Sequence, residues 1–403
     1  MSLTAVDLMM TRDEKRAGAV LASIFALRML GLFLILPVFS IYATTLPGGE
    51  DIFLVGLALG AYGLTQAFLH IPFGFASDRL GRKPVITAGL LIFAAGSFLA
   101  AAAPDIHWVI AGRVVQGAGA VSAVVMALAA DLVRETHRTK VMAMIGASIG
   151  LVFALSLMVA PPLYAAIGME GIFTLTGLLA LGAIVLLFKG MPDVPTATQR
   201  VAVQRVPFSV VLGDNSLLRM NFGVLVLHMM QTALWVVVPL ALVKTANFPA
   251  ASHWKIYLPA VLASFIFMVP ALLFAERRQQ IKPVLLAAIL LMIASQAVFW
   301  WIGHDALSIG VGLLLFFVAF NILEALQPSL VSRMAPASAR GAAMGVYNTT
   351  QSMGLFLGGA LGGLLLKYVG SNGVYGFSMV MGTLWFLSTI GLSFKGEKNG
   401  ITQ

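Results

Sequence analysis

The sequence predicts an all-α membrane protein with twelve transmembrane helices, from its composition, its hydropathy and the spacing of its apolar segments. Of the 403 residues, 60% are hydrophobic and 10% are charged, and the mean hydropathy is +0.96. Since soluble domains are roughly 25% charged, this composition excludes a soluble enzyme, a disordered chain and a nucleic-acid-binding domain. The chain has no Cys, so it offers neither a disulfide framework nor a thiolate metal site, and we expect no cofactor and no metal.

Twelve apolar segments follow one another along the chain, and each is long enough for the roughly 20 residues that a membrane-spanning helix needs. None alternates with a period of two, which argues against an outer-membrane barrel. The first segment is too long for a cleaved signal peptide, and acidic residues precede it. We expect the spans at 17–43, 52–76, 83–103, 106–132, 139–166, 170–189, 218–245, 253–275, 283–303, 306–332, 340–366 and 372–394.

The distribution of Lys and Arg predicts the orientation of these spans. With both termini on one side, twenty of the 25 cations fall on that side, and only Lys244, Lys255 and Lys367 fall on the other. Cytoplasmic loops of membrane proteins carry such an excess of Lys and Arg. The sequence therefore predicts a multi-pass protein of a bacterial inner membrane with both termini in the cytoplasm.

The segment 190–217 interrupts the series of spans with three prolines and no continuous apolar run. We interpret it as a cytoplasmic linker, with a short helix at 208–213, between an N-terminal bundle (1–189) and a C-terminal bundle (218–403). The two halves also repeat each other weakly. Asp78-Arg79 followed by Lys83-Pro84-Val85 is matched by Glu276-Arg277 followed by Lys282-Pro283-Val284, each after the second span of its half.

The most specific signal is the spacing Gly74-x-x-x-Asp78-Arg79-x-Gly81-Arg82-Lys83 after the second span. This stretch matches motif A of the major facilitator superfamily. Span 4 carries Arg113-Val-Val-Gln116-Gly117-Ala-Gly119, which resembles motif B of that family, and it ends in Asp131-Leu-Val-Arg134. Leu30-Gly31 and Leu36-Pro37 in span 1 resemble the drug/proton antiporter branch, whereas span 5 has Ala160-Pro161-Pro162-Leu163 in place of that branch's signature.

The resemblance covers residues 12 to about 395. It implies the major facilitator fold, in which two pseudo-symmetric six-helix bundles rock about one central site. It also implies that Asp78, Arg82 and Asp131 form a cytoplasmic charge cluster that holds the bundles together near Gly341 when the site opens outward. The expected gate residues are Gly74, Asp78, Arg79, Gly81, Arg82, Lys83, Asp131 and Arg134.

Three ionisable residues fall inside predicted spans, namely Glu324, Arg28 and Arg113. Because a charge at bilayer depth costs roughly 2.5–3.5 kcal/mol on insertion scales, such residues usually serve a function. Glu324 is therefore the expected proton carrier, and the alternative is a structural carboxylate paired with Arg28 or Arg113. Either arginine is also a candidate for binding an anionic group, and Arg113 for satisfying backbone carbonyls near the Gly-rich stretch.

Histidines in two spans, His70 and His228, add groups that titrate near neutral pH. We expect Glu324 and His228 to carry proton coupling. Polar residues within apolar spans usually face the interior of the bundle. The expected lining of the substrate cavity is Arg28, Tyr62, Gln66, Arg113, Gln116, Gln231, Asn321, Tyr347, Asn348 and Gln351.

The sequence thus favours a proton-coupled transporter that exports small amphipathic compounds. The alternative within transport is a symporter that imports a nutrient or an organic anion. The partners of the protein are expected to be a small molecule, protons and the bilayer, without nucleic acid, and we expect a monomer.

Gly146-Ala-Ser148-Ile-Gly150 matches the nucleophile elbow of hydrolases, but it lies within a span rather than in a strand–turn–helix, so we expect no enzyme. A receptor that binds without transporting is the remaining alternative.

Overall fold

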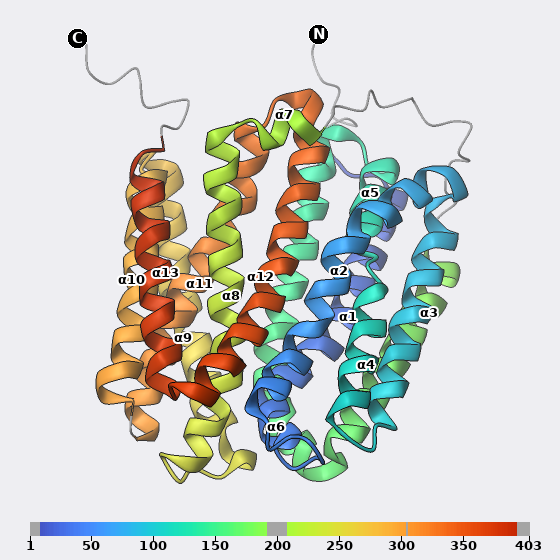
Figure 1. The fold of residues 1–403 in the computed structure, drawn as a ribbon. Helices are drawn as coiled ribbons and strands as arrows, with labels where there is room; N and C mark the ends of the chain where they lie inside the picture. The colour runs from blue at the N-terminus through green and yellow to red at the C-terminus, as the bar shows by residue number, and fades with distance from the viewer. Residues whose placement is uncertain (1–8, 192–207, 304, 393–403) are drawn as a thin grey trace, which may run out of the picture.

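The structure is a computed structural model that describes residues 9–191, 208–303 and 305–392. Every regular element in these ranges is helical, which confirms the all-α prediction (Figure 1). The α-helices are α1 (Arg12–Ala43), α2 (Ile52–Leu80), α3 (Arg82–Ala101), α4 (Ile106–Ala118), α5 (Ser122–Leu132), α6 (Glu135–Gly190), α7 (Phe208–Leu212), α8 (Asn215–Lys244), α9 (Trp254–Arg277), α10 (Ile281–Ile302), α11 (Ala306–Met334), α12 (Arg340–Tyr368) and α13 (Ser371–Ile390).

The helix α6 contains two membrane crossings. At 1.5 Å per residue its 56 residues would extend about 84 Å, far more than the roughly 30 Å of a bilayer core. The backbone turns at Gly168, whose φ of 67° and ψ of −179° suit glycine alone. The expected spans 139–166 and 170–189 therefore lie on either side of this turn, and the described helices supply twelve crossings in all.

The expected span 106–132 is present and is made of two helices, α4 and α5, which residues 119–121 separate. The cause is close packing by glycine. A Cβ atom on Gly117 would overlap the Tyr62 carbonyl oxygen of α2, and one on Gly119 would overlap the Gly89 carbonyl oxygen of α3. The chain can bend here because its glycines let neighbouring backbones approach.

Several helices begin at a side chain that caps their first turn. The hydroxyl of Thr11 accepts from the Glu14 amide while the Glu14 carboxylate accepts from the Thr11 amide, which makes a capping box at the start of α1. Aspartate side chains accept backbone N–H groups at the starts of other helices. These N-caps are Asp51 (α2), Asp105 (α4), Asp214 (α8) and Asp305 (α11).

The bundle has two ends, which we define by residues. The charged end holds Arg82, Arg134 and the short helix α7, whereas the far end holds Asp51 and Lys367. The helix α7 lies at the upper edge of Figure 1. The start of α1 and the end of α6 meet at the charged end, where Arg16 donates to the carbonyl oxygens of Lys189 and Gly190. The helix α7 confirms the predicted short helix, and residues 192–207 of the expected linker lie outside the described residues.

In the middle of the bundle, α12 lies between α8 and α2 (Figure 1). Gly354 and Gly358 pack against the α8 backbone, and Gly362 packs against Ala233, so these glycines allow close helix packing. Gly359 and Gly363, on another side of α12, pack against the backbone of Gly56 on α2. The same helix therefore contacts both halves of the chain through glycine.

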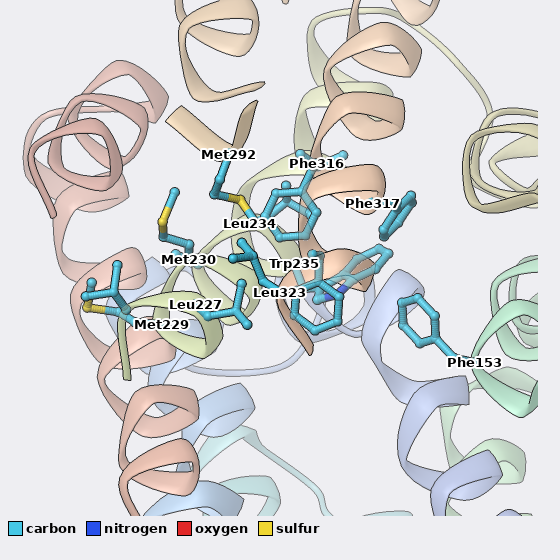
Figure 2. Close-up of a cluster of buried hydrophobic side chains, with 14 of the residues drawn as sticks. Phe153, Leu227, Met229, Met230, Leu234, Trp235, Met292, Phe316, Phe317 and Leu323 are labelled. Carbon is cyan, nitrogen blue, oxygen red and sulfur yellow. The ribbon is translucent and has the colours of Figure 1, made fainter. Parts of the chain in front are cut away.

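The buried core beside this contact is rich in aromatic and Met side chains (Figure 2). Phe153 of α6 packs edge-on to Phe317 of α11, with ring centroids 5.9 Å apart, and the Phe317 ring lies 6.4 Å from that of Trp235 on α8. The Ser40 hydroxyl of α1 donates to the Trp235 carbonyl oxygen at 2.6 Å. These contacts join the first six spans to the last six.

Candidate transport site

Glu324, His228 and Gln351 meet between α11, α8 and α12, well inside the helices. The Glu324 Oε2 atom lies 3.4 Å from the His228 Nε2 atom. The Gln351 side-chain amide nitrogen lies 2.7 Å from the same imidazole nitrogen and 3.4 Å from Glu324 Oε1. His228 is 4% exposed and the Glu324 side chain is 38% exposed, although the Glu324 Oε2 atom that faces the imidazole is buried.

The hydrogen bonds of His228 define its tautomer. Its Nδ1 atom lies 3.0 Å from the Val224 carbonyl oxygen, which can only accept, so Nδ1 carries a proton. In the neutral ring Nε2 is then an acceptor for Gln351, and a Glu324 carboxylate at 3.4 Å faces a lone pair. One added proton, on either Nε2 or the carboxyl, turns this repulsive contact into an attractive one.

The other cavity candidates of the second half lie on the same three helices as this triad. The Asn321 amide, on α11, donates to the Ser264 hydroxyl of α9 at 2.8 Å. Tyr347 lies on α12 one turn before Gln351 and is buried, and its hydroxyl has no hydrogen-bond partner among the described residues. Gln231 is buried one turn after His228 on α8, and Asn348 is half-buried on α12.

Arg28 does not contact Glu324. Its guanidinium donates to the Ser122 and Tyr62 hydroxyls, at 2.7 Å each, and lies 5.4 Å from the centroid of the Phe93 ring. It also donates to the Gly119 carbonyl oxygen at 3.5 Å, in the break between α4 and α5. Arg28 is 2% exposed, so it is enclosed within the first six spans and supports the bent backbone of span 4.

Arg113 likewise bonds within the first six spans. It donates to the carbonyl oxygens of Ala58 and Leu59 on α2, at 3.4 and 3.3 Å, and to the Gln116 side-chain oxygen. The Gln116 amide donates in turn to the Ser97 hydroxyl of α3 at 2.8 Å. Both residues are buried, and their contacts match the backbone-carbonyl alternative for Arg113 rather than pairing with Glu324.

A second polar contact joins the halves between α2 and α12. The Ser352 hydroxyl lies 3.3 Å from His70 Nε2 and donates to the Gln66 side-chain oxygen at 3.5 Å. All three side chains are buried. Gln66 thus lies at the contact between the halves, and sequence reasoning did not select Ser352, which no motif marks.

The motif A residues form a charge cluster centred on Arg82. This side chain donates to Asp78 at 2.8 Å, to Asp131 of α5 at 2.9 Å and to the Ser77 hydroxyl at 2.6 Å. The Gly81 backbone has a φ of 95°, which explains glycine at the turn between α2 and α3. The loop after the second span is shorter than predicted, because Asp78 and Arg79 still belong to α2. Lys83 is half-buried in the first turn of α3.

Two expected gate residues, Arg134 and Gly74, lie outside these contacts of Arg82. Arg134 donates to the Glu14 carboxylate at 2.9 and 3.0 Å, which ties the end of α5 to the start of α1. A Cβ atom on Gly74 would meet nothing within 4 Å, and the same holds for Gly341 at the start of α12. In this conformation there is open space beside both glycines.

An ion pair closes the far end between the halves. Lys367, in the last turn of α12, lies 2.9 Å from Asp51, the N-cap of α2. The hydrogen bond from Lys367 holds the pKa of the Asp51 carboxyl below its ordinary value. The capping role of Asp51 can be predicted from the sequence, but its partner Lys367, 316 positions away, cannot.

We expect Asp51→Asn and Lys367→Gln each to open the far end several-fold more often, and the double variant to add little because both changes remove one contact. The chain has no Cys, so spin labels at T45C and V369C report the separation directly. Because the Asp51 pKa is lowered, the pair persists above the ordinary Asp pKa of about 3.9 and is lost only as pH falls through the lowered value. The effect of each change should therefore be equal at pH 8 and pH 5, and additive single changes would contradict a direct pair.

The hydrolase-like sequence around Ser148 is structural. The Ser148 hydroxyl donates to the Ile145 carbonyl oxygen at 2.7 Å and to that of Ala22 at 3.2 Å, within continuous helix α6. It therefore joins α6 to α1, as an ordinary helix contact does.

Comparison with known families supports a transporter. The family model described as Major Facilitator Superfamily matches residues 21–359. The chain is 42% identical over 381 residues to the Inner membrane transport protein YajR of Escherichia coli strain K12, and the match covers 94% of this chain and 84% of that protein. It is 29% identical to the Multidrug resistance protein MdtH of Yersinia enterocolitica, over 90% of this chain and 89% of that protein.

Solved structures give the same fold. The crystal structure of the nucleoside transporter NupG matches 95% of this chain and 100% of its own, with a TM-score of 0.73 at 13% identity. The human organic anion transporter MFSD10 matches 94% of this chain and 100% of its own, with a TM-score of 0.70 at 19% identity. These relatives and folds are transporters, in agreement with the expectation that the chain is not an enzyme.

Proposed function

This chain belongs to the major facilitator superfamily, and we propose that it is a proton-coupled secondary transporter that exports small amphipathic compounds from the cytoplasm across a bacterial inner membrane. The triad of Glu324, His228 and Gln351 is the observation that carries the proposal. A carboxyl 3.4 Å from a buried imidazole nitrogen, both inside membrane-spanning helices, is a site for one exchangeable proton.

Gln351 allows both protonation states to be accommodated. When His228 is neutral at Nε2, the amide NH₂ of Gln351 donates to it, as the 2.7 Å contact requires. When that nitrogen carries a proton, rotation of the same amide presents its oxygen as an acceptor. Since Gln351 lies on α12, between α8 and α2, proton binding acts on the helix that contacts both halves.

We propose that residues 1–189 and 218–403 are the two rocking bundles and that the structure is the inward-open state. The contacts between the halves lie at the far end and in the middle, at Asp51–Lys367, Gly56–Gly359 and Gln66–Ser352. A Cβ atom on Gly341, at the charged end, would meet nothing within 4 Å. The positive-inside rule assigns the charged end to the cytoplasm, and we propose that the protein works as a monomer.

The resemblance to MdtH and the span 1 motif favour export. The test uses purified protein in liposomes loaded with a small amphipathic dye, ethidium, with the interior made acidic or alkaline. Antiport predicts that dye moves against the direction of proton flow. Dye movement in the same direction as the protons would indicate a symporter. Dye movement that does not depend on the pH gradient would exclude proton coupling.

We expect Asp78→Asn to shift the protein toward the inward-open state, because it removes one of the two carboxylates on Arg82. Spin labels at the exposed positions L80C and S338C should show a several-fold smaller closed population at the charged end. Asp13→Asn, which removes an exposed acid at the same end, is the control. Distances equal to wild type in Asp78→Asn would exclude this role for the cluster.

A further inference from the structure

A small groove lies at the charged end, outside the transport site, between α9, the start of α10 and α11. Its volume is about 210 Å³. Its walls are mostly aliphatic, and two opposite charges, Glu276 and Arg333, line it together with the Ser329 hydroxyl. The aliphatic lining comes from Leu272, Leu273, Ile281, Ala325, Leu326 and Leu330.

The two charges are available to a ligand. Both side chains belong to exposed residues, and among the residues that the structure describes neither forms an ion pair within 4.0 Å. A carboxylate and a guanidinium in one groove, not joined to each other, present an acceptor and a planar donor fork at separate positions. A ligand with both a cationic and an anionic group complements this arrangement.

The groove lies next to an exposed apolar surface of α9 and a run of basic residues. The preceding turns of α9 expose large apolar side chains, namely Ile266, Phe267, Val269, Leu273 and Phe274. Such a surface on a membrane-spanning helix faces acyl chains. Basic residues follow directly, at Arg277, Arg278 and Lys282, where the chain leaves the apolar layer. The groove therefore lies between the apolar surface of α9 and the basic residues that follow it.

We infer that this groove binds the headgroup of a phosphatidylethanolamine lipid. Arg333 holds the phosphate, Glu276 accepts hydrogen bonds from the primary ammonium, and one acyl chain follows Leu273 toward the exposed apolar surface of α9. A phosphatidylglycerol headgroup offers no cation to Glu276. The trimethylammonium of phosphatidylcholine has no N–H to donate, so it cannot form the same bonds.

Binding at this position acts on the helix of the transport site. Glu324 directly precedes Ala325, which lines the groove, so the lipid contacts the same turn of α11 that carries the triad. The lipid site does not depend on the proposed proton coupling, because headgroup recognition is measurable on the resting protein.

The experiment measures binding of three lipids with identical acyl chains to the purified full-length protein in detergent. Native mass spectrometry and thermal unfolding are recorded with phosphatidylethanolamine, phosphatidylcholine and phosphatidylglycerol. We expect phosphatidylethanolamine to bind at least several-fold more tightly than the other two and to raise the unfolding temperature most. Equal binding of the ethanolamine and choline lipids to wild type, or no saturable binding of either, would overturn the assignment.

Substitutions of Glu276 and Arg333 test whether the lipid binds in this groove. Glu276→Gln should remove the preference for ethanolamine over choline, whereas Arg333→Gln should weaken both lipids together. Arg277→Gln, which removes an exposed neighbouring charge that does not line the groove, is the matched control and should keep the wild-type preference. An equal loss in Arg277→Gln and Arg333→Gln would show that general positive charge, rather than this groove, attracts the lipid.

Discussion

Liposomes containing Glu324→Gln are expected to show pH-gradient-driven dye transport no greater than protein-free liposomes. The substitution keeps the shape of the side chain and its contact with Gln351, but it removes the group that exchanges a proton beside His228. Exchange of dye across the membrane without a pH gradient should persist, because the rocking motion itself needs no proton. The measurement compares gradient-driven transport with gradient-free exchange in the same preparation.

The controls for Glu324→Gln separate loss of coupling from loss of fold. Glu50→Gln removes an exposed acid at the far end and should leave both rates unchanged. The thermal unfolding temperature of Glu324→Gln should stay near wild type, since its side chain is 38% exposed. If instead Glu324→Gln retained gradient-driven transport but unfolded at a lower temperature, the carboxylate would be structural and the proton would travel elsewhere.

The second large effect is expected from Gly359→Ala, which should drive the protein out of the proposed inward-open state. The new methyl group would overlap the Gly56 carbonyl oxygen of α2, a backbone atom that cannot move aside alone. Overpacking costs roughly 1–3 kcal/mol, which corresponds to a population shift of about 5–150-fold. The far end should therefore open, and spin labels at T45C and V369C should report the larger separation.

Two glycine variants control for this result. Gly358→Ala would overlap the Met229 carbonyl oxygen of α8, within the same half, so it should lower the unfolding temperature without a comparable shift between states. A Cβ atom on Gly182 meets nothing within 4 Å, so Gly182→Ala should behave as wild type. A far-end distance in Gly359→Ala identical to wild type would mean that the α2–α12 contact is not what closes this end.

Much of the fold could be predicted from the sequence because its signals are local. The apolar runs predicted the membrane-spanning helices, and eleven helical segments are long and apolar enough to cross a membrane, with the two crossings of α6 counted as one. The break at residues 119–121 was not predictable from hydropathy, since the stretch stays apolar through it. It arises from close contacts of Gly117 and Gly119 with two other helices, and hydropathy carries no such information.

The residues of the site were identifiable one by one, but their partners were not. Placing a charge inside the membrane costs free energy, and for this reason Glu324, Arg28 and Arg113, the charges within spans, were selected from the sequence. Whether they pair with one another depends on which way each helix faces. The structure joins Glu324 to His228 and encloses the two arginines among hydroxyls and carbonyl oxygens of the first six spans. A contact between positions as distant as Gln66 and Ser352 cannot be predicted from the local sequence around either residue.

Four glycines bring the backbones of α2 and α12 together. Gly56 and Gly60 meet Gly359 and Gly363 there, backbone against backbone. Substitutions elsewhere on the two helices leave this backbone contact in place, provided that the four glycines remain. We therefore expect substitutions at the proposed cavity positions to be tolerated more readily than substitutions at these four glycines.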